Sequence, residues 1–280
     1  MAKGKHDYTP EVGGFVYHDP SHSYFTDFVE MTGVTSVLDC VGSPGGLMQY
    51  AANHAAAHGL QYLPPEGFTL ALKAHPKLTT EVARLLDKQF PVFKEARLAH
   101  KRNTQKAADS GTDNHSLCEL WEQGKTVTET EELKRYKEWY GLNVSKTLFV
   151  ERPIFSKTWH VGGTPDGGFL LKDGKALIND KKFKDSIYDN KPFWQMAAYR
   201  KMLEEMASDT TTPVTIIWAD NTETYKNPKE YLSSLGETKW NGSVVIQINS
   251  KEANPLFRYA YEEDLKSFES SLWIYRHIKN

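Results

Sequence analysis

The sequence predicts a protein of mixed α and β structure (α/β or α+β), in which helices flank a mixed central β-sheet and an N-terminal helical region packs beside it. Three observations predict this class. Helix-forming patterns fill most of the chain before residue 143, β-branched and aromatic residues alternate after it, and helical segments then interrupt the strands. Hydrophobic residues make up 39% of the 280 residues and charged residues 25%, so a sizeable core is available.

The first part of the chain is expected to form a short hairpin followed by helices. Phe15–Tyr17 and Ser23–Phe25 are β-prone runs on either side of a polar stretch, which predicts a β-hairpin. Residues 34–38 are expected to form a turn or a helix start. Ser43-Pro44 is typical of a helix N-terminus, because proline suits the first helical position. Helices are then predicted over residues 47–58, 81–108 with a break at Pro91, 115–122 and 130–140.

The second part of the chain is expected to form the sheet. Lys172–Lys175, with the sequence Lys-Asp-Gly-Lys, is a strong signal for a hairpin turn. Strands are predicted over residues 147–155, 159–163, 168–171, 176–183, 214–219 and 243–248, and helices over residues 192–205 and 261–278. We therefore assign residues 1–142 to an N-terminal hairpin and helical region and residues 143–280 to the core, and expect the two to form one compact unit.

Net charge and cysteine content narrow the class of protein. The formal net charge is −2, so any affinity for nucleic acid depends on how the charges are distributed. Cys40 and Cys118 match no zinc spacing and cannot supply the four ligands of an iron–sulfur cluster, so no such cluster is expected. The polar N-terminus lacks the apolar stretch of a signal peptide, and no apolar run of about 18 residues predicts a membrane span. We expect a cytoplasmic protein with reduced thiols.

Two carboxylates and one lysine are predicted to converge at one end of the sheet. Asp180 and Lys182 are two residues apart on one strand, so their side chains point to the same face. The hairpin turn near Gly174 brings Asp166 back towards them. Carboxylate oxygens suit Mg²⁺ or Mn²⁺, and such an ion activates water and neutralises charge on a scissile phosphate. With a lysine to orient the water or stabilise the transition state, the trio suits phosphodiester hydrolysis.

These residues also have a purely structural interpretation. Asp-x-Lys occurs by chance in most long chains, and that motif alone favours a turn aspartate and a solvated strand face. Three further features favour a site. The strand is apolar until its charges appear near its end, where unused charge would be costly. Gln195 and Tyr199 share one helix face, and the sequence Gly-Thr-Asp-Asn-His at residues 111–115 opens a helix upstream.

Four motifs in this order resemble the RecB-like branch of the PD-(D/E)XK nuclease superfamily. They are Gly-Thr-x-x-His at residues 111–115, Gly-Thr-Pro-Asp at residues 163–166, Asp-Lys-Lys at residues 180–182 and Gln-x-x-x-Tyr at residues 195–199. The resemblance covers residues 111–199. It extends to Tyr24 and residues 34–38, a region similar to the opening of phage and mitochondrial exonucleases of this branch. The ordered set is fairly specific, whereas each motif alone is weak.

The resemblance implies a restriction-endonuclease-like core and a role for each matching residue. The implied metal ligands are His115, Asp166, Asp180 and the backbone carbonyl of Lys181; Lys182 is the implied catalytic residue, and Gln195 and Tyr199 are implied to contact the substrate strand. Structural alternatives stay open, because His115 could be a satisfied histidine on a helix surface. Gln195 and Tyr199 could simply form a helix face under the sheet.

The sequence departs from the family pattern beside the second aspartate. The family usually has an aromatic residue between the aspartate and the lysine and a threonine after the lysine, whereas this chain has Lys181 and Phe183. Strand alternation places Lys181 on the opposite face from Asp180, so Lys182 is the expected catalytic lysine. Glu119 and Glu151 are further acids near the site, and Glu119 is expected to be a solvated helix residue rather than a ligand.

A basic helical face is the predicted contact with the phosphate backbone. Lys94, Arg97 and Lys101 are spaced three or four residues apart, so they share one broad side of a helix that continues to Lys106. Lysine and arginine on such a face can neutralise phosphates and release counterions. The alternative is a solvated charged face with no ligand.

The expected function is therefore a Mg²⁺- or Mn²⁺-dependent deoxyribonuclease. The resemblance favours an exonuclease that acts on single-stranded or duplex DNA ends in phage or host replication, recombination or repair, with proteins of those processes as partners and no membrane contact. If it is a phage protein, it would act in the host cytoplasm. One alternative is a catalytically silent DNA-binding or partner-docking module, and another is a structure-specific endonuclease. The intact set of Asp166, Asp180 and Lys182 favours an enzyme.

Overall fold

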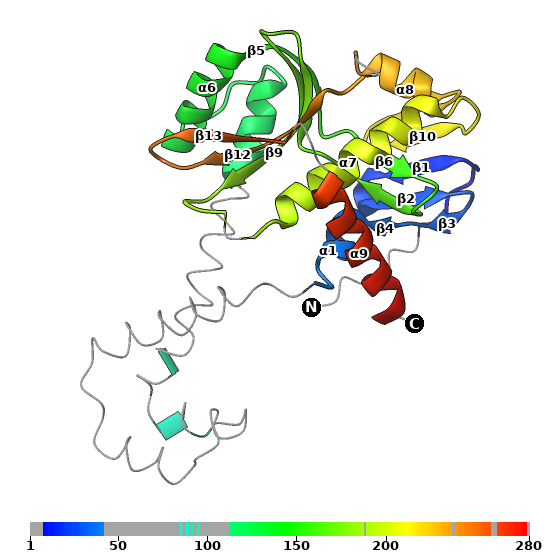
Figure 1. The fold of residues 1–280 in the computed structure, drawn as a ribbon, viewed down its shortest axis with the longest axis horizontal. Helices are drawn as coiled ribbons and strands as arrows, with labels where there is room; N and C mark the ends of the chain where they lie inside the picture. The colour runs from blue at the N-terminus through cyan, green and yellow to red at the C-terminus, as the bar shows by residue number, and fades with distance from the viewer. Residues whose placement is uncertain are drawn as a thin grey trace. The chain divides into compact units, whose positions relative to one another are not determined.

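The computed structural model describes residues 8–41, 113–187, 189–236, 239–258 and 262–278, together with residues 85, 88, 89, 91, 94 and 95. The chain forms two compact units (Figure 1). The main unit comprises Met1–Gly42 and Asn114–Asn280, and the second unit comprises Ser43–Asp113. The described residues of the second unit from 85 to 95 are helical and exposed. Arg97, Lys101 and the helix predicted over residues 47–58 lie outside the described residues.

The first sheet joins the two ends of the main unit. β1 (Phe15–His18) and β2 (Ser23–Thr26) form the predicted antiparallel hairpin. β1 also pairs in parallel with β10 (Val214–Ile217), and the strand order is β11-β10-β1-β2-β3, with β11 at Thr222–Tyr225 and β3 at Val29–Glu30. The N-terminal strands therefore belong to the same unit as the C-terminal half of the chain. The boundary at residue 142 that the sequence suggested does not coincide with the division between units.

The second sheet carries the predicted Asp-Lys-Lys motif on its middle strand. The strand order is β13-β12-β9-β8-β5. The bounds are Ala253–Arg258 for β13, Gly242–Ile248 for β12, Ala176–Phe183 for β9, Gly167–Leu171 for β8 and Val144–Val150 for β5. β9 runs parallel to β12 and antiparallel to β8. Its first six residues are all buried, because both faces of this strand are covered, and such strands carry nearly continuous apolar runs.

A third sheet corrects the prediction of a single central sheet. It contains β4 (Thr32–Gly33), β7 (Val161–Gly163) and β6 (Ile154–Ser156) in the order β4-β7-β6. The strand predicted over residues 147–155 is therefore wrong as a single element, since β5 and β6 belong to different sheets. The chain breaks between them because Glu151 adopts a left-handed conformation, with φ at 44°, and Pro153 lacks a backbone donor.

Two helices of the main unit begin at side-chain caps that the local sequence supplies. α6 (Glu131–Asn143) begins after Thr130, whose side chain accepts a hydrogen bond from the Leu133 backbone N–H. α8 (Pro228–Ser234) likewise begins after a side-chain cap, Asn227, and has proline at its first position. This helix was not predicted from the sequence. The other helices are α1 (Val34–Leu38), the 3₁₀ turn η1 (Asp19–Ser21), a helix over residues 113–122, α7 (Lys191–Ser208) and α9 (Glu262–Ile278).

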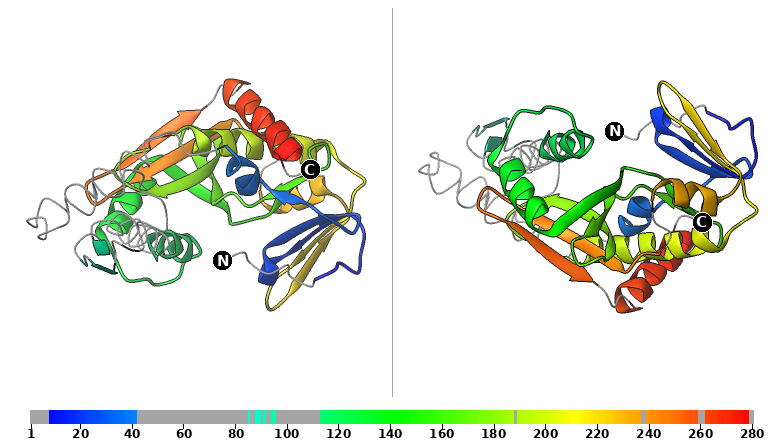
Figure 2. Two further views of the ribbon diagram at one scale, coloured as in Figure 1. Left: turned by 90° about the horizontal axis from the view of Figure 1, so that it is seen from below. Right: turned by 90° about the horizontal axis from the view of Figure 1, so that it is seen from above.

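α7 lies at the centre of the main unit. It packs against β9 and β12 of the second sheet, and against β6, α8 and α9. Figures 1 and 2 show it between the two five-stranded sheets. One apolar cluster surrounds α7, and another lies on the opposite face of β9, beneath α6 and the helix over residues 113–122. Among the described helices, none combines the length and apolar character that crossing a bilayer requires.

Candidate metal and catalytic site

The β8–β9 hairpin brings the two candidate aspartates to one end of the second sheet. Gly167 pairs with Asn179, so Asp166 and Asp180 lie one position beyond this pair on neighbouring strands. Both residues are buried, with 9% of Asp166 and 2% of Asp180 exposed. Asp166 Oδ2 accepts a hydrogen bond from the Lys181 backbone N–H at 2.6 Å. The structure thus places together the two acids that the sequence predicted to converge.

Lys182 lies beside Asp180, as strand alternation predicts. Its Nζ lies 2.7 Å from Asp180 Oδ1. The other carboxylate oxygen, Asp180 Oδ2, is buried and has no hydrogen-bond partner among the described residues. Burial raises the pKa of Asp180 to about 6, although the nearby Lys182 charge acts in the opposite direction. A buried carboxylate oxygen without a partner is costly unless a cation or proton completes it, so this oxygen fits the role of a metal ligand.

His115 lies between two carboxylates. Its Nε2 atom is 2.8 Å from Asp166 Oδ2, and its Nδ1 atom contacts Glu119, one helical turn later. Burial alone would lower the pKa of His115, but its hydrogen bonds with Asp166 and Glu119 outweigh burial and raise the pKa to about 10. The helix over residues 113–122 therefore delivers the predicted histidine to the predicted aspartate.

Glu119 and Glu151 extend the site beyond the predicted ligand set. One donor atom each from His115, Glu119 and Glu151 lie within 4.8 Å of one another, a spacing that could hold a metal ion. The Glu151 backbone N–H donates to the Asp166 carbonyl at 3.1 Å, which anchors Glu151 beside the first aspartate. Burial raises the pKa of Glu151 to about 8, and the neighbouring Glu119 carboxylate adds to the rise. Both acids are half-buried.

The expectation that Glu119 is a solvated helix residue is therefore wrong. Its spacing of four residues from His115 is the signal that could have identified it, because such residues share one side of a helix. No comparable sequence signal marks Glu151. Its position depends on its own left-handed backbone conformation between β5 and β6, which belong to different sheets.

The predicted substrate-side residues line a cavity of about 480 Å³. Gln195 Nε2 donates to the Tyr199 hydroxyl at 2.9 Å, and Tyr199 is buried. A Cβ atom at Gly163 would lie 2.4 Å from the Tyr199 ring, so this position requires glycine. The Tyr24 hydroxyl lies 2.7 Å from Thr164 Oγ1, two residues before Asp166. The cavity thus joins the N-terminal hairpin, α7 and the strand-to-strand connection that carries Asp166.

Lys181 points away from Asp180, again as strand alternation predicts. Its Nζ lies 2.9 Å from Glu122 Oε2, and neither side chain is more than 3% exposed. Burial by itself would lower the pKa of Lys181, but the charges of Glu122 and Asp166 raise it above its usual value. Glu122 belongs to none of the four sequence motifs. The proposed role of the Lys181 backbone carbonyl as a metal ligand stays a prediction.

No model of a known protein family matches the sequence, and no curated protein shows significant similarity to it. The family resemblance consequently depends on the four sequence motifs and on the positions of the residues that carry them.

Proposed function

We propose that the chain is a divalent-metal-dependent DNA nuclease with a restriction-endonuclease-like core. The observation that carries this proposal is the proximity of two buried acids, Asp166 just before β8 and Asp180 within β9, where one Asp180 oxygen has no hydrogen-bond partner among the described residues and Lys182 lies beside the other. A solvated strand face would leave both oxygens in water, so the alternative structural interpretation does not explain this burial.

Each side chain has a role in this proposal. Asp166 and Asp180 would hold Mg²⁺ or Mn²⁺ together with His115, which contacts Asp166. The group of His115 with the half-buried Glu119 and Glu151, which contains neither aspartate, offers an adjoining set of donors. The bound ion would supply activated water and neutralise charge on the scissile phosphate. Lys182 is held in place by Asp180 and places one positive charge next to the acids, where it would stabilise the negatively charged transition state.

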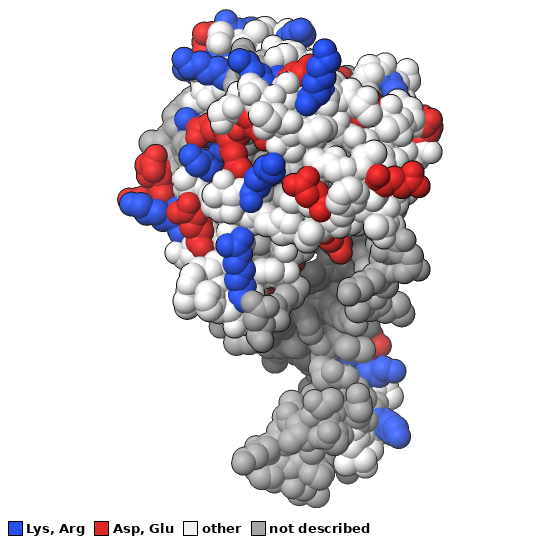
Figure 3. All heavy atoms as spheres, turned by 90° about the vertical axis from the view of Figure 1, so that its right-hand side faces the viewer, with Lys and Arg blue, Asp and Glu red and all other residues white. Residues whose placement is uncertain are grey.

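The cavity beside Thr164 supports a nucleotide strand as the substrate. Its described lining contains the acid Glu30 and no lysine or arginine, and it is rich in tyrosine, serine and threonine hydroxyl groups, with the side-chain amide of Gln195. Such a lining suits sugars and bases, which accept hydrogen bonds and stack on aromatic rings, better than it suits phosphate. On the face drawn in Figure 3, lysine and arginine side chains of the main unit are interspersed with acids. Lys94, in the second unit, is exposed and stays a proposed phosphate contact.

Metal-dependent digestion tests the proposal directly. End-labelled single-stranded and duplex DNA would be incubated with Mg²⁺, with Mn²⁺ or with EDTA, for the wild type and for Asp180→Asn. We expect cleavage by the wild type with metal, none with EDTA, and none by the variant, which lacks a charged ligand. An inactive wild type that binds DNA tightly would instead favour a silent binding module, and wild-type turnover by Asp180→Asn would remove Asp180 from the site.

Closed circular DNA distinguishes an exonuclease from an endonuclease. We propose, from the resemblance, that the enzyme acts at DNA ends. Linear and relaxed closed-circular DNA of the same sequence would be digested in parallel with Mn²⁺. We expect loss of the linear form and survival of the circle, whereas equal loss of both would show an endonuclease. Binding should weaken as salt rises, because phosphate contacts release counterions.

A further inference from the structure

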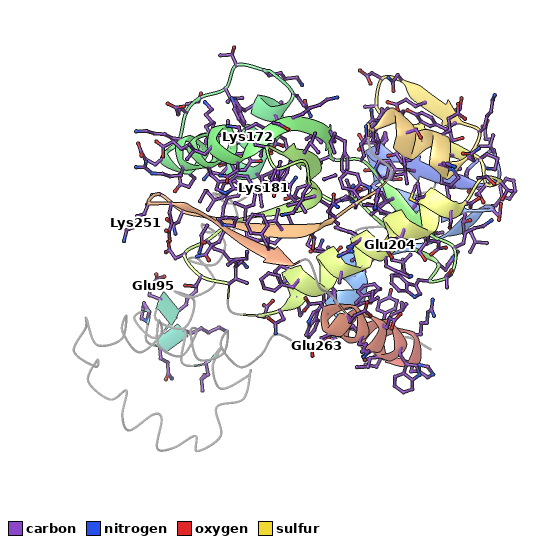
Figure 4. All side chains as sticks on the ribbon, turned by 45° about the horizontal axis from the view of Figure 1, so that its top comes forward. Glu95, Lys172, Lys181, Glu204, Lys251 and Glu263 are labelled. Carbon is purple, nitrogen blue, oxygen red and sulfur yellow. The ribbon has the colours of Figure 1, made fainter. Side chains whose placement is uncertain are left out.

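A buried ion pair lies directly behind the candidate site. Lys181 Nζ and Glu122 Oε2 are 2.9 Å apart, and their side chains are 0% and 3% exposed. The Tyr136 hydroxyl donates to the other Glu122 oxygen, and the Lys181 ammonium lies 5.6 Å from the centre of the Tyr136 ring. In Figure 4, Lys181 lies within the body of side chains, whereas Lys251 lies at its edge, on the β12–β13 turn. Both oxygens of Glu122 and the ammonium of Lys181 are thus partnered.

The pair closes a ring of contacts that begins and ends on one oxygen atom. Asp166 Oδ2 accepts the Lys181 backbone N–H at 2.6 Å, and the Lys181 side chain then reaches Glu122. Glu122 is seven residues after His115 on the same helix, a spacing of about two turns that puts both on one side. His115 Nε2 returns to Asp166 Oδ2 at 2.8 Å. The position of the histidine relative to the aspartate is therefore constrained from two directions.

Stability alone does not explain a buried pair of this kind. Removing two charges from water has a large free-energy cost, and replacement of a buried ion pair by apolar residues of similar size is often neutral or stabilising. The surroundings here are largely apolar, because Cys118, Leu133 and Phe169 lie in the cluster on this face of β9, so an apolar replacement would deprive only the Tyr136 hydroxyl of a partner. A directional link between β9 and the helix is what the ion pair adds and an apolar contact would lack.

We propose that Lys181 is a positioning residue, whose buried pair with Glu122 fixes the helix over residues 113–122 against β9 and thereby sets His115 relative to Asp166. This inference rests on the proposed metal-dependent function, because positioning matters only if His115 and Asp166 share a metal. Lys181 touches neither the water nor the phosphate in this scheme. It acts through the helix, and its loss should weaken metal binding without weakening the contacts that hold DNA.

The double variant Lys181→Met/Glu122→Leu tests the proposal by removing both charges while keeping the volume. We expect Mn²⁺ affinity, measured by calorimetry in the absence of DNA, to fall about 10- to 100-fold, as for other residues that orient metal ligands. We expect kcat to fall with it while KM for DNA stays within about twofold, because the cavity proposed to hold the strand is lined by no residue of β9 or of the helix over residues 113–122. Amide hydrogen exchange in residues 113–122 should accelerate, since the link to β9 is gone.

Two controls separate positioning from general damage. Arg135→Met/Glu138→Leu removes an exposed ion pair of α6, with Nη1 and Oε2 2.9 Å apart, and should leave metal affinity and exchange in residues 113–122 unchanged. The second control, Glu122→Gln, keeps an oxygen that can accept from Lys181 but leaves the buried ammonium without a counter-charge, so it should lower the free energy of unfolding as Lys181→Ala does, and it shows whether Mn²⁺ affinity falls with lost stability alone. If the double variant does not fold, Tyr136→Phe removes only the hydroxyl that holds Glu122, and should weaken Mn²⁺ binding in the same direction by a smaller factor.

The outcomes distinguish this inference from the proposed function. A wild type that neither binds Mn²⁺ nor cleaves DNA would overturn the proposed function, and with it the positioning role, whatever the variants do. A wild type that binds and cleaves, together with a folded double variant or a Tyr136→Phe variant of unchanged Mn²⁺ affinity and unchanged exchange, would overturn the positioning role alone. A double variant whose KM for DNA rises while its Mn²⁺ affinity stays at the wild-type value would also contradict the positioning role.

Discussion

The two faces of β9 carry the same kind of ion pair in opposite settings. On one face Lys182 pairs with Asp180, the lysine side chain is 27% exposed, and one aspartate oxygen has no partner. On the other face Lys181 pairs with Glu122, both side chains are closed off from solvent, and a tyrosine satisfies the remaining oxygen. The comparison shows that residue type does not separate a reactive group from a scaffold. The difference is that one carboxylate oxygen of Asp180 has no hydrogen-bond partner among the described residues, whereas both oxygens of Glu122 have one.

Removal of Lys181 alone should have the largest effect on folding. Lys181→Ala leaves Glu122 charged, buried and unpaired, so we expect the free energy of unfolding to fall by about 3–5 kcal/mol. Urea denaturation monitored by circular dichroism measures this change. Lys181→Met/Glu122→Leu serves as the control, since it leaves no unpaired charge and removes only the acceptor of the Tyr136 hydroxyl, so its loss should be smaller, about 1–3 kcal/mol. If the single and double variants are equally unstable, the pair is not isolated from water as the structure shows.

Removal of Lys182 should instead act on the chemistry. Lys182→Met deletes the cation next to Asp180, and we expect kcat to fall about 100- to 1000-fold, the effect of removing one transition-state contact. Single-turnover cleavage of labelled DNA measures it. Lys184→Met is the matched control, because Lys184 follows one residue after the end of β9 and is exposed. A comparable loss in the control would mean that general positive charge, rather than the Asp180 contact, supports cleavage.

The acids beside Asp166 should give the site a characteristic pH dependence. The pKa of Glu151 rises from its ordinary value of 4.5 to about 8 on folding, so the folded state holds a proton that the unfolded state has lost. Stability attributable to this group is therefore present below pH 4.5 and is lost as pH rises through 8. With EDTA present, Glu151→Gln should melt a few degrees above the wild type at pH 8 and close to it at pH 5.

Metal ions provide the complementary measurement for Glu151. A divalent cation would neutralise the carboxylate, so Mn²⁺ at pH 8 should raise the melting temperature of the wild type more than that of Glu151→Gln. An equal response of the two proteins would exclude Glu151 from the metal centre, while leaving the pH effect in EDTA intact.

Two glycine substitutions should give the smallest effects, one on each side of β9. Gly163→Ala places a Cβ 2.4 Å from the Tyr199 ring on the α7 side, and should reduce stability by about 1–3 kcal/mol through overpacking. Gly141→Ala lies in α6, where nothing stands within 4 Å of the added atom, and should raise stability by about 0.5–1 kcal/mol. Thermal melts of both variants check the opposite signs. A stabilised Gly163→Ala would mean that Tyr199 is not held where the structure places it.

Local sequence patterns predicted the helices and strands around the site, but they did not predict how the strands are arranged into sheets. The β1–β2 hairpin, the strands β8 and β9, and the helices α6, α7 and α9 follow from turn residues, caps and periodicity, all of which act over a few residues. The parallel pairing of β1 with β10 and the separation of β5 from β6 depend on contacts between distant segments. A pattern of apolar residues cannot specify which strand will be its neighbour.

In the site, too, short-range features were predicted from the sequence, whereas contacts between distant segments were harder to predict. Alternation on a strand was enough to place Asp180 and Lys182 together and Lys181 opposite, because the period of two is fixed by backbone geometry. The contacts made by His115 with Asp166, and by Lys181 with Glu122, join a helix to a strand more than 50 residues away in sequence. Four motifs suggested the first of these contacts by resemblance, whereas the second joins the middle residue of the Asp-Lys-Lys motif to Glu122, which lies outside every motif.

The parallel pairing of β1 with β10 has a consequence for how the protein is made. Phe15 pairs with Val214, so the first strand cannot find its partner until about 200 further residues have left the ribosome. Contacts between such distant segments are slow to form, because the entropy of closing a long loop is lost before the contacts contribute any stabilising free energy. During synthesis the β1–β2 hairpin therefore exposes an unpaired strand edge, bearing the apolar residues Phe15 and Tyr17, to chaperones and to other nascent chains.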